Sequence, residues 1–264
     1  MRVHVALTPA EFPGLELETQ AAVVVDVIRA TTTVVAACAA GCRRVIPAVS
    51  AAAARARSAD FPGEETLLAG EQGGEPIGGF DLGNSPLEYT ADRVRGRTII
   101  FTTTNGTGAM VAAGRAVAAA VAALTNVDTV ARWAAAHGRD LTVLCAGERG
   151  GFSLEDAVCA GFLVDGMASS GTPLEVSDAA VAARRLAEHY APRLHQLLDD
   201  SRWARRLSQA GRAADLDACL RLGTVTQVPV FETGAIVPGP PALTWLNATT
   251  QTERDRRTAP EPTR

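Results

Sequence analysis

Residues Ala21–Asp26 read A-A-V-V-V-D and lead directly into V-I-R-A-T-T-T, which ends at Thr33. A short apolar run rich in β-branched residues is typical of a strand buried on both faces. The alanine-rich segment Thr31–Ala40 has the composition of a helix, and Gly41 supplies a common stop signal. The stretch therefore predicts a buried strand, a polar turn and a helix.

The same alternation of apolar runs and alanine-rich segments continues along the chain. We expect further strands at Arg44–Pro47, Thr66–Gly70, Arg97–Phe101, Ala116–Ala122, Leu141–Cys145 and Val228–Phe231, and helices at Ser50–Ser58, Thr107–Ala113, Asn126–His137 and from Ser153 onward. Ser85-Pro-Leu-Glu88 has the pattern of a capping box at a helix start. The alternation predicts an α/β fold with a mixed, largely parallel sheet covered on both faces. We expect one domain over residues 1–248 and a disordered tail over residues 249–264.

Composition excludes several classes of function. The 264 residues carry a net charge of −4, which gives no sign of binding to nucleic acid or to a membrane. The chain has no lysine, so a Walker-type phosphate loop and Schiff-base chemistry are both excluded. No apolar run is long enough to span a bilayer, and the N-terminus lacks a signal-peptide pattern. Five cysteines without framework spacing fit a reducing compartment, so we expect a cytoplasmic protein. The oligomeric state stays open, a homo-oligomer included.

Polar clusters follow the carboxyl ends of four expected strands. They are Asp26 with its turn, the glycine-rich loop Gly70–Tyr89, the segment Thr102–Thr107 and the segment Ala146–Asp156. Ligands bind at this edge in open α/β sheets. An ordered loop so rich in glycine allows close approach of the backbone to a ligand, whereas a flexible surface loop is the alternative. The shared position at one edge favours a binding site.

The residue types in these clusters suit an anion together with a divalent cation. Helix starts can hold an anion through free N–H groups, although ordinary N-capping would explain any one of them. Candidates for this role are Thr31, Thr104, Asn105, Gly106, Thr107 and Ser153, with Arg29 and Arg149 as cationic partners of the substrate. Carboxylate oxygens are the ligands that Mg²⁺ and Ca²⁺ prefer, and Mg²⁺ takes only one or two of them. The available donors are Asp26, Glu71, Glu75, Asp81, Glu155 and Asp156.

The sequence gives weaker support to a zinc site, a cysteine nucleophile or a dinucleotide-binding site. The histidines lie away from the clusters, and no pair of cysteines has zinc-ligand spacing. Cys145 begins a segment similar to a cysteine-phosphatase loop, but Gly151 stands where that loop has its arginine, so we interpret Cys145 as a buried apolar residue. Gly106-Thr-Gly108 is not a dinucleotide fingerprint, because Val111 occupies the place of the third glycine.

Four motifs, in order, resemble the 2-phosphosulfolactate phosphatase family. They are D-V-I-R-A-T-T-T from Asp26, G-E-x-x-G-x-x-I-x-G-F-D-L-G-N-S-P-L-E-Y from Gly70, T-T-T-N-G-T from Thr102, and C-A-G-E-R-G-G-F-S-L-E-D-A-V-C-A-G from Cys145. The resemblance is strong between residues 23 and 161 and looser to residue 231. It implies a three-layer α/β/α fold and a magnesium-dependent acid phosphatase. The implied reaction converts 2-phospho-3-sulfolactate to 3-sulfolactate and phosphate, a step toward coenzyme M.

The resemblance also directs the site assignment. We expect Asp26, Glu71 and Asp81 to be catalytic and Mg²⁺ to be held among Asp26, Glu71, Asp81, Glu155 and Asp156. Phosphate ester hydrolysis needs charge neutralisation and an oriented nucleophile. We favour water activated by the metal over covalent attack by Asp26, because Ile28 stands where haloacid-dehalogenase-type phosphatases carry a second aspartate. Two alternatives are a phosphatase for another small phosphorylated acid and a non-catalytic binder of an anionic metabolite.

Overall fold

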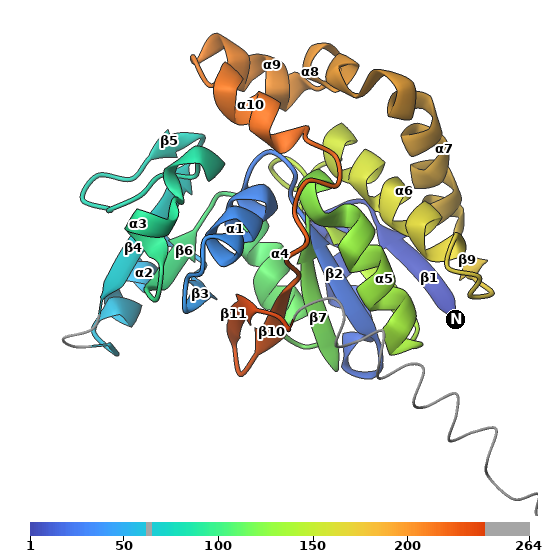
Figure 1. The fold of residues 1–264 in the computed structure, drawn as a ribbon, viewed down its shortest axis with the longest axis horizontal. Coiled ribbons are helices and arrows are strands. Elements are labelled where there is room, and N and C mark those ends of the chain that lie inside the picture. The colour runs from blue at the N-terminus through green and yellow to red at the C-terminus, as the bar shows by residue number, and fades with distance from the viewer. Residues whose placement is uncertain (62–64, 241–264) are drawn as a thin grey trace, which may run out of the picture.

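A computed structural model of the chain describes residues 1–61 and 65–240. Its strands form one sheet in the order β5-β4-β6-β3-β11-β10-β7-β2-β8-β1-β9 (Figure 1). Their bounds are β1 Arg2–Ala6, β2 Ala21–Val25, β3 Arg44–Pro47, β4 Thr66–Gln72, β5 Glu75–Pro76, β6 Thr98–Thr102, β7 Ala118–Ala122, β8 Leu141–Cys145, β9 Glu175–Val176, β10 Pro229–Glu232 and β11 Ala235–Pro238.

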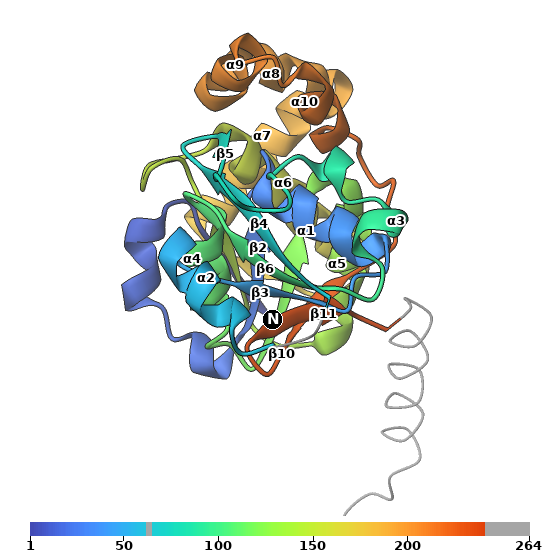
Figure 2. The same ribbon diagram turned by 90° about the vertical axis from the view of Figure 1, so that its left-hand side faces the viewer.

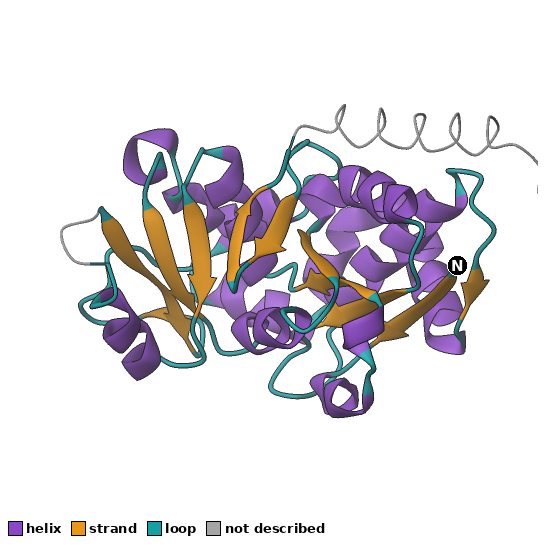
Figure 3. Cartoon of the chain, turned by 90° about the horizontal axis from the view of Figure 1, so that it is seen from below, coloured by secondary structure: helices purple, strands orange, loops and turns teal. Residues whose placement is uncertain are grey.

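The sheet consists of two parallel groups joined by the antiparallel hairpin β10–β11. One group is β4-β6-β3 and the other is β7-β2-β8-β1-β9. The hairpin pairs with β3 only through Ile236 and Val45, and with β7 only through Val230 and Ala120. Because each junction is a single residue pair, the sheet is free to twist there. Figure 3 shows the two groups on either side of the hairpin.

Helices cover both faces, which gives the three-layer α/β/α arrangement that the sequence predicts. Their bounds are α1 Ala30–Ala39, α2 Ala51–Ser58, α3 Ala91–Val94, α4 Gly106–Ala113, α5 Val127–His137, α6 Leu154–Ala168, α7 Asp178–Tyr190, α8 Leu197–Asp200, α9 Arg202–Gln209 and α10 Ala213–Cys219. Strand β2 is buried along its whole length. Val23 and Val25 share a core with α5 and α6, whereas Ala22 and Val24 share another with α1 and α4. The period of two along a strand explains this division.

Helices α8, α9 and α10 form a separate layer, which we call the cap. In Figures 1 and 2 the cap lies above the ends of the central strands. Leu207 and Leu216 anchor it to the core that α5 and α6 build. The cap is therefore placed to cover loops that follow the strands.

Most of the expected elements are confirmed to within two residues, and one expectation is wrong. Ser85–Glu88 does not cap an α-helix, because only a short 3₁₀ turn, Pro86–Glu88, follows Ser85. The Ser85 hydroxyl donates instead to Asp215, and the Glu88 carboxylate accepts from Gly83 N–H. The sequence analysis also missed β1, β5, β9 and β11. The tail expected at residues 249–264 lies outside the described residues, and no described helix could cross a membrane.

Candidate active site

Asp26 lies directly after β2 and is almost fully buried. Its backbone is fixed by Thr31, whose hydroxyl donates to Asp26 O at 2.8 Å and accepts from Asp26 N–H at 3.0 Å. Its Oδ1 accepts a hydrogen bond from Ala30 N–H, the first residue of α1, at 3.2 Å. Thr31, expected to bind substrate, thus holds the turn that carries Asp26.

Gly106 brings the start of α4 against Asp26. A Cβ atom on Gly106 would lie 2.6 Å from Asp26 Oδ2 and 2.5 Å from Ala30 Cβ. No side chain fits this space without displacement, so glycine is required here for close packing. The segment after β6 and the turn after β2 therefore meet at one point.

Glu71 is the second buried carboxylate, and glycine again explains its position. Gly70 has φ +132°, and a Cβ on it would lie 1.8 Å from Thr102 O, so β4 can approach β6 only through glycine. Glu71 Oε1 accepts from Thr104 N–H at 2.7 Å, and Oε2 accepts from Gly74 N–H at 2.5 Å and from the Thr104 hydroxyl at 3.1 Å. This carboxylate ties the glycine-rich loop to the segment after β6.

Glu155 and Asp156 occupy the first turn of α6, and both are buried. Asp156 Oδ1 accepts from Val27 N–H at 2.9 Å, and its Oδ2 accepts from Gly147 N–H at 3.1 Å. Ser153 caps the helix by accepting from Asp156 N–H at 3.3 Å. Asp156 therefore joins the turn after β2 to the loop after β8.

The buried carboxylates raise the cost of one another's ionisation. Burial raises the pKa of Asp26 to about 7; Ala30 N–H opposes this rise, and the charges of Glu71 and Glu155 add to it. Burial likewise raises the pKa of Glu155, and hydrogen bonds to Ser201 and Ser153 oppose that change. The pKa of Asp156 is raised well above its usual range by burial and by the charges of Asp26 and Glu155. Such a cluster favours a cation or a proton between its members.

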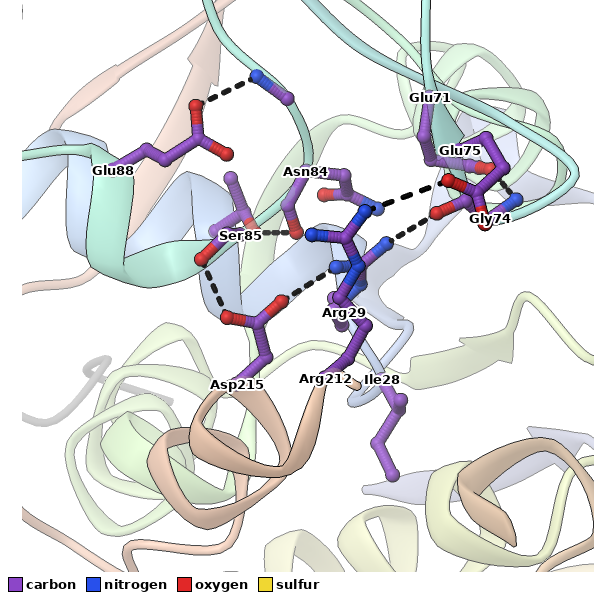
Figure 4. A network of polar contacts seen from close by, with 12 residues as sticks. Ile28, Arg29, Glu71, Gly74, Glu75, Asn84, Ser85, Glu88, Arg212 and Asp215 are labelled. Atoms are coloured by element: carbon purple, nitrogen blue, oxygen red, sulfur yellow. Dashed lines mark hydrogen bonds and ion pairs between the residues drawn. The ribbon is translucent and has the colours of Figure 1, made fainter. Parts of the chain in front are cut away.

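Arg29 is buried in a network that the sequence analysis did not foresee. Its guanidinium donates to Asp215 of α10 at 2.6 Å and to Gly74 O at 3.0 Å (Figure 4). The second Asp215 oxygen accepts from the Ser85 hydroxyl at 2.6 Å. The Trp203 indole N–H of α9 donates to Ile28 O at 2.9 Å. The cap therefore packs on the turn after β2 that carries Ile28 and Arg29.

Several predicted site residues lie elsewhere or have a local role. Asp81 is exposed at the outer edge of β4, where it accepts from Leu68 N–H at 2.8 Å; no contact in the described part of the chain joins it to the buried carboxylates. Thr107 bonds Thr103 at the start of α4. Asn105 Oδ1 accepts from Arg149 N–H at 3.0 Å.

Arg149 and Glu75 complete the placement of the predicted residues. Arg149 is exposed, and its guanidinium has no partner among the residues that the structure describes. Glu75 lies exposed on β5, one residue beyond the Gly74 carbonyl that Arg29 binds. Asp215, Ser85 and Trp203 are the site residues that sequence reasoning missed. No local motif marks Asp215 or Trp203, because their partners lie far away in the chain.

Two cavities open beside the carboxylates. One, of about 360 Å³, is lined by Glu71, Thr102, Thr103, Thr104, Ser50 and neighbouring residues. The other, of about 300 Å³, is lined by Glu148, Ser153, Glu155, Ser201, Trp203 and neighbouring residues. Both are large enough for a small phosphorylated acid or part of one.

The donor set fits Mg²⁺ in a limited way. Within residues 1–61 and 65–240, no three His, Cys, Asp or Glu side chains form a ready set of metal ligands. Both oxygens of Glu71 and Asp156 already accept backbone N–H groups, whereas Asp26 Oδ2 accepts none. Mg²⁺ needs only one or two carboxylates when water and substrate supply the rest. Asp26 with Glu155 meets that need, but the full set of five carboxylates does not.

The fold and the site define an α/β protein with a buried acidic cluster and with cavities beside Glu71 and Glu155. The chain belongs to the 2-phosphosulpholactate phosphatase family, whose model matches residues 6–234. This membership places it among the phosphoric monoester hydrolases.

Curated relatives support the family over most of the chain. A "probable 2-phosphosulfolactate phosphatase" of Symbiobacterium thermophilum is 44% identical over 225 residues, which cover 85% of this chain and 97% of the relative. Proteins with the same description from Caldanaerobacter subterraneus and Clostridium acetobutylicum are 36% and 30% identical. They cover 84% and 90% of this chain, and 91% and 100% of their own lengths.

Proposed function

We propose that the protein hydrolyses 2-phospho-3-sulfolactate to 3-sulfolactate and inorganic phosphate, and that it needs Mg²⁺. Family membership and the printed descriptions of the relatives support the substrate. The observation that carries the site assignment is the buried Asp26 carboxylate, whose pKa is raised to about 7 where loops after β2 and β6 meet. The product would then lie on a route toward coenzyme M.

The chain's own residues supply a frame around the reacting phosphate. Asp26 Oδ2 accepts no hydrogen bond from the residues that the structure describes, so it is available to the reaction centre. Glu71 fixes the backbone of Thr104 and Gly74, and Asp156 fixes Val27 and Gly147. Arg149 has a free guanidinium that can pair with a substrate oxyanion. Rigid loops of this kind hold substrate in a reactive orientation.

Bound Mg²⁺ would neutralise negative charge on the carboxylates and on the phosphate. Asp26 would be the first residue to hold it, with Glu155 as the second, because the charge of Glu155 already acts on Asp26. The overall reaction adds water across the P–O bond: the hydroxyl joins phosphorus, and the leaving sulfolactate oxygen takes the proton. Asp26 therefore has two alternative roles. It can hold the cation, or it can attack phosphorus as a nucleophile.

Phosphate release from 2-phospho-3-sulfolactate tests the proposal. We expect turnover by the purified chain with Mg²⁺, loss of turnover in EDTA, and recovery when Mg²⁺ is restored. Asp26→Asn should lose at least about 100-fold in kcat, a typical effect of removing an electrostatic contribution of this kind. Turnover of another phosphorylated acid alone would favour a different substrate, and binding without turnover would favour a non-catalytic protein.

A ³²P-labelled substrate separates the two roles of Asp26. Acid quenching during turnover should yield no phosphoprotein if water attacks phosphorus directly. A label that peptide mapping places on Asp26 would establish the covalent route. Asp81→Asn serves as a control, since Asp81 is exposed and its carboxylate accepts from Leu68 N–H outside the buried cluster.

A further inference from the structure

Arg212 brings a second guanidinium from the cap to the glycine-rich loop. It precedes α10, and one of its terminal nitrogens lies 3.5 Å from Glu75 Oε2. Its Nε is buried and has no hydrogen-bond partner in the described structure. The side chain is still 34% exposed, so part of this group can meet a ligand from solution.

The position of Arg212 is fixed by its neighbours in the network. Asp215, three residues later on the same turn, holds Arg29, and Arg29 donates to Gly74 O. Arg212 reaches Glu75, the next residue after Gly74. The two guanidinium groups therefore contact adjacent residues of the glycine-rich loop, Arg29 through the Gly74 carbonyl and Arg212 through the Glu75 side chain, and Figure 4 shows them close together between the cap and the loop.

A second unpartnered polar group lies in the same network. Asn84 is buried, and its Oδ1 has no hydrogen-bond partner within residues 1–61 and 65–240. Figure 4 draws its side chain near the two guanidinium groups. Buried polar atoms are nearly always paired with protein, water or a ligand. A half-turn of the amide would present its N–H₂ group, so Asn84 and Arg212 together can offer donors to one oxyanion.

The two arginines differ in how readily they can accept a ligand. Arg29 and Asp215 are both buried, and each neutralises the charge of the other. The Arg212–Glu75 pair is more open, with the Glu75 side chain 69% exposed. Exposed ion pairs contribute little and are easily exchanged for another anion. Arg212 is thus the cation of this network that is free to change partner.

We propose that Arg212 binds the sulfonate of the substrate and so determines its specificity. This inference rests on the proposed function, since that function supplies a substrate with a phosphate, a carboxylate and a sulfonate. The carboxylate is attached directly to the carbon that carries the phosphate ester, whereas the sulfonate extends one carbon further. Arg212 contacts Glu75, which follows Glu71 in the glycine-rich loop, so we assign to it the group that lies farther from the ester. Glu75 is the resting partner that the sulfonate replaces.

Kinetics with paired substrates test the assignment. Arg212→Ala should lower kcat/KM for 2-phospho-3-sulfolactate about 10- to 100-fold, the equivalent of a lost charge-assisted hydrogen bond, and mainly through KM. The same variant should change kcat/KM for 2-phospholactate, which lacks the sulfonate, less than about threefold. Arg206→Ala is the matched control, because Arg206 stacks on Trp203 within the same cap. Glu75→Gln should lower KM for the sulfonated substrate, since it releases Arg212.

Binding of 3-sulfolactate separates this inference from the proposed function. Calorimetry should show weaker binding to Arg212→Ala than to the wild type, with lactate and inorganic phosphate as comparison ligands. If the wild type binds 3-sulfolactate through Arg212 but does not hydrolyse the ester, the function fails and the inference stands. The inference is overturned if Arg212→Ala lowers kcat/KM equally for both substrates. It is also overturned if a folded Arg212→Ala variant binds 3-sulfolactate as the wild type does.

Discussion

Asp26 shows how one side chain can link burial, charge and folding stability. A carboxylate removed from water favours its neutral form, and nearby carboxylates strengthen that preference. Its pKa of about 7, against an ordinary value of 3.8, means that the folded state holds a proton that the unfolded state has already lost. The folded protein without a cation is therefore penalised as the pH rises from about 4 to about 7.

Replacement of Asp26 by Asn should remove this penalty. The folded state binds more protons than the unfolded state between the two pKa values, so stability falls with rising pH in the wild type. A difference of about three pH units corresponds to at most about 4 kcal/mol. We expect Asp26→Asn to be about 2–4 kcal/mol more stable than the wild type at pH 8 in EDTA.

Urea unfolding at a series of pH values measures this effect. The advantage of Asp26→Asn should shrink as the pH falls from 8 toward 4, because the two states then differ less and less in the charge of Asp26, and below the ordinary pKa of 3.8 Asp26 is mainly protonated in both states. Glu155 and Asp156 also have raised pKa values, so some pH dependence remains in the variant, and the difference between the two proteins is the relevant quantity. A constant difference across this pH range would contradict the assigned pKa.

Gly106 is the residue at which packing and chemistry meet. Gly106→Ala places a methyl group 2.6 Å from Asp26 Oδ2, so either α4 or the carboxylate must move. We expect a stability loss of about 1–3 kcal/mol, and a fall in kcat of about 100-fold from displacement of the reacting groups. Gly108→Ala is the control, because a Cβ there meets nothing within 4 Å. Equal activity in the two variants would show that α4 does not position Asp26.

At the scale of elements, local pattern predicted the strands and helices that are buried or strongly capped. Arg44–Pro47 and Leu141–Cys145 have the predicted bounds, because short apolar runs between polar turns leave little choice of register. Strand β1 was missed because Arg2 and His4 break its apolar run with polar side chains. The capping box at Ser85 failed because the Ser85 hydroxyl donates to Asp215, which is distant in the chain, and the Glu88 carboxylate accepts from the nearby Gly83 N–H instead.

The packing of α6 against α7 depends on Gly161. A Cβ at Gly161 would lie 2.1 Å from Ala183 O and 2.8 Å from Ala187 Cβ, so Gly161→Ala must separate the helices. We expect a loss of about 2–3 kcal/mol in unfolding free energy. Gly166→Ala on the same helix meets only Ala131 Cβ at 2.8 Å, and gains up to about 1 kcal/mol of helix propensity. The contact with Ala131 is also closer than Cβ atoms normally approach, so α5 must shift as well. Denaturant midpoints should therefore fall for both variants, and further for Gly161→Ala, whose Cβ meets a backbone oxygen; a reversed order would contradict the contact pattern.

At the scale of the whole molecule, the sequence analysis predicted which residues gather around Asp26 better than it predicted the outer parts of the candidate site. Asp26, Glu71 and Gly106 were found because each follows a strand in a loop of unusual composition, and the structure brings them together. Asp81 belongs to the same motif as Glu71, but the segment of Asp81 and Leu82 pairs with the outer edge of β4, which places Asp81 away from the buried carboxylates. Asp215 could not be found, since an acidic residue on a helix is ordinary until tertiary structure sets Arg29 beside it.

The seating of the cap gives a prediction for the molecule as a whole. Arg29→Ala should destabilise the protein by about 3–5 kcal/mol, because it leaves the Asp215 carboxylate buried without its cation. The structure therefore attaches a stability cost to a residue that we expected from the sequence to bind substrate. Arg115→Ala breaks an exposed pair with Glu18 and should cost at most about 1 kcal/mol.

A double-mutant cycle decides whether Arg29 and Asp215 act as a unit. Arg29→Met with Asp215→Leu removes both charges and should recover much of the stability that Arg29→Met loses alone, because no buried charge is then left unpaired. Hydrogen exchange should rise in α8–α10 of the Arg29 single variant, and fall again in the double variant, if the pair seats the cap. Additive losses in the cycle, or exchange that rises evenly over the whole chain, would mean that the cap is held by its apolar contacts and not by this pair.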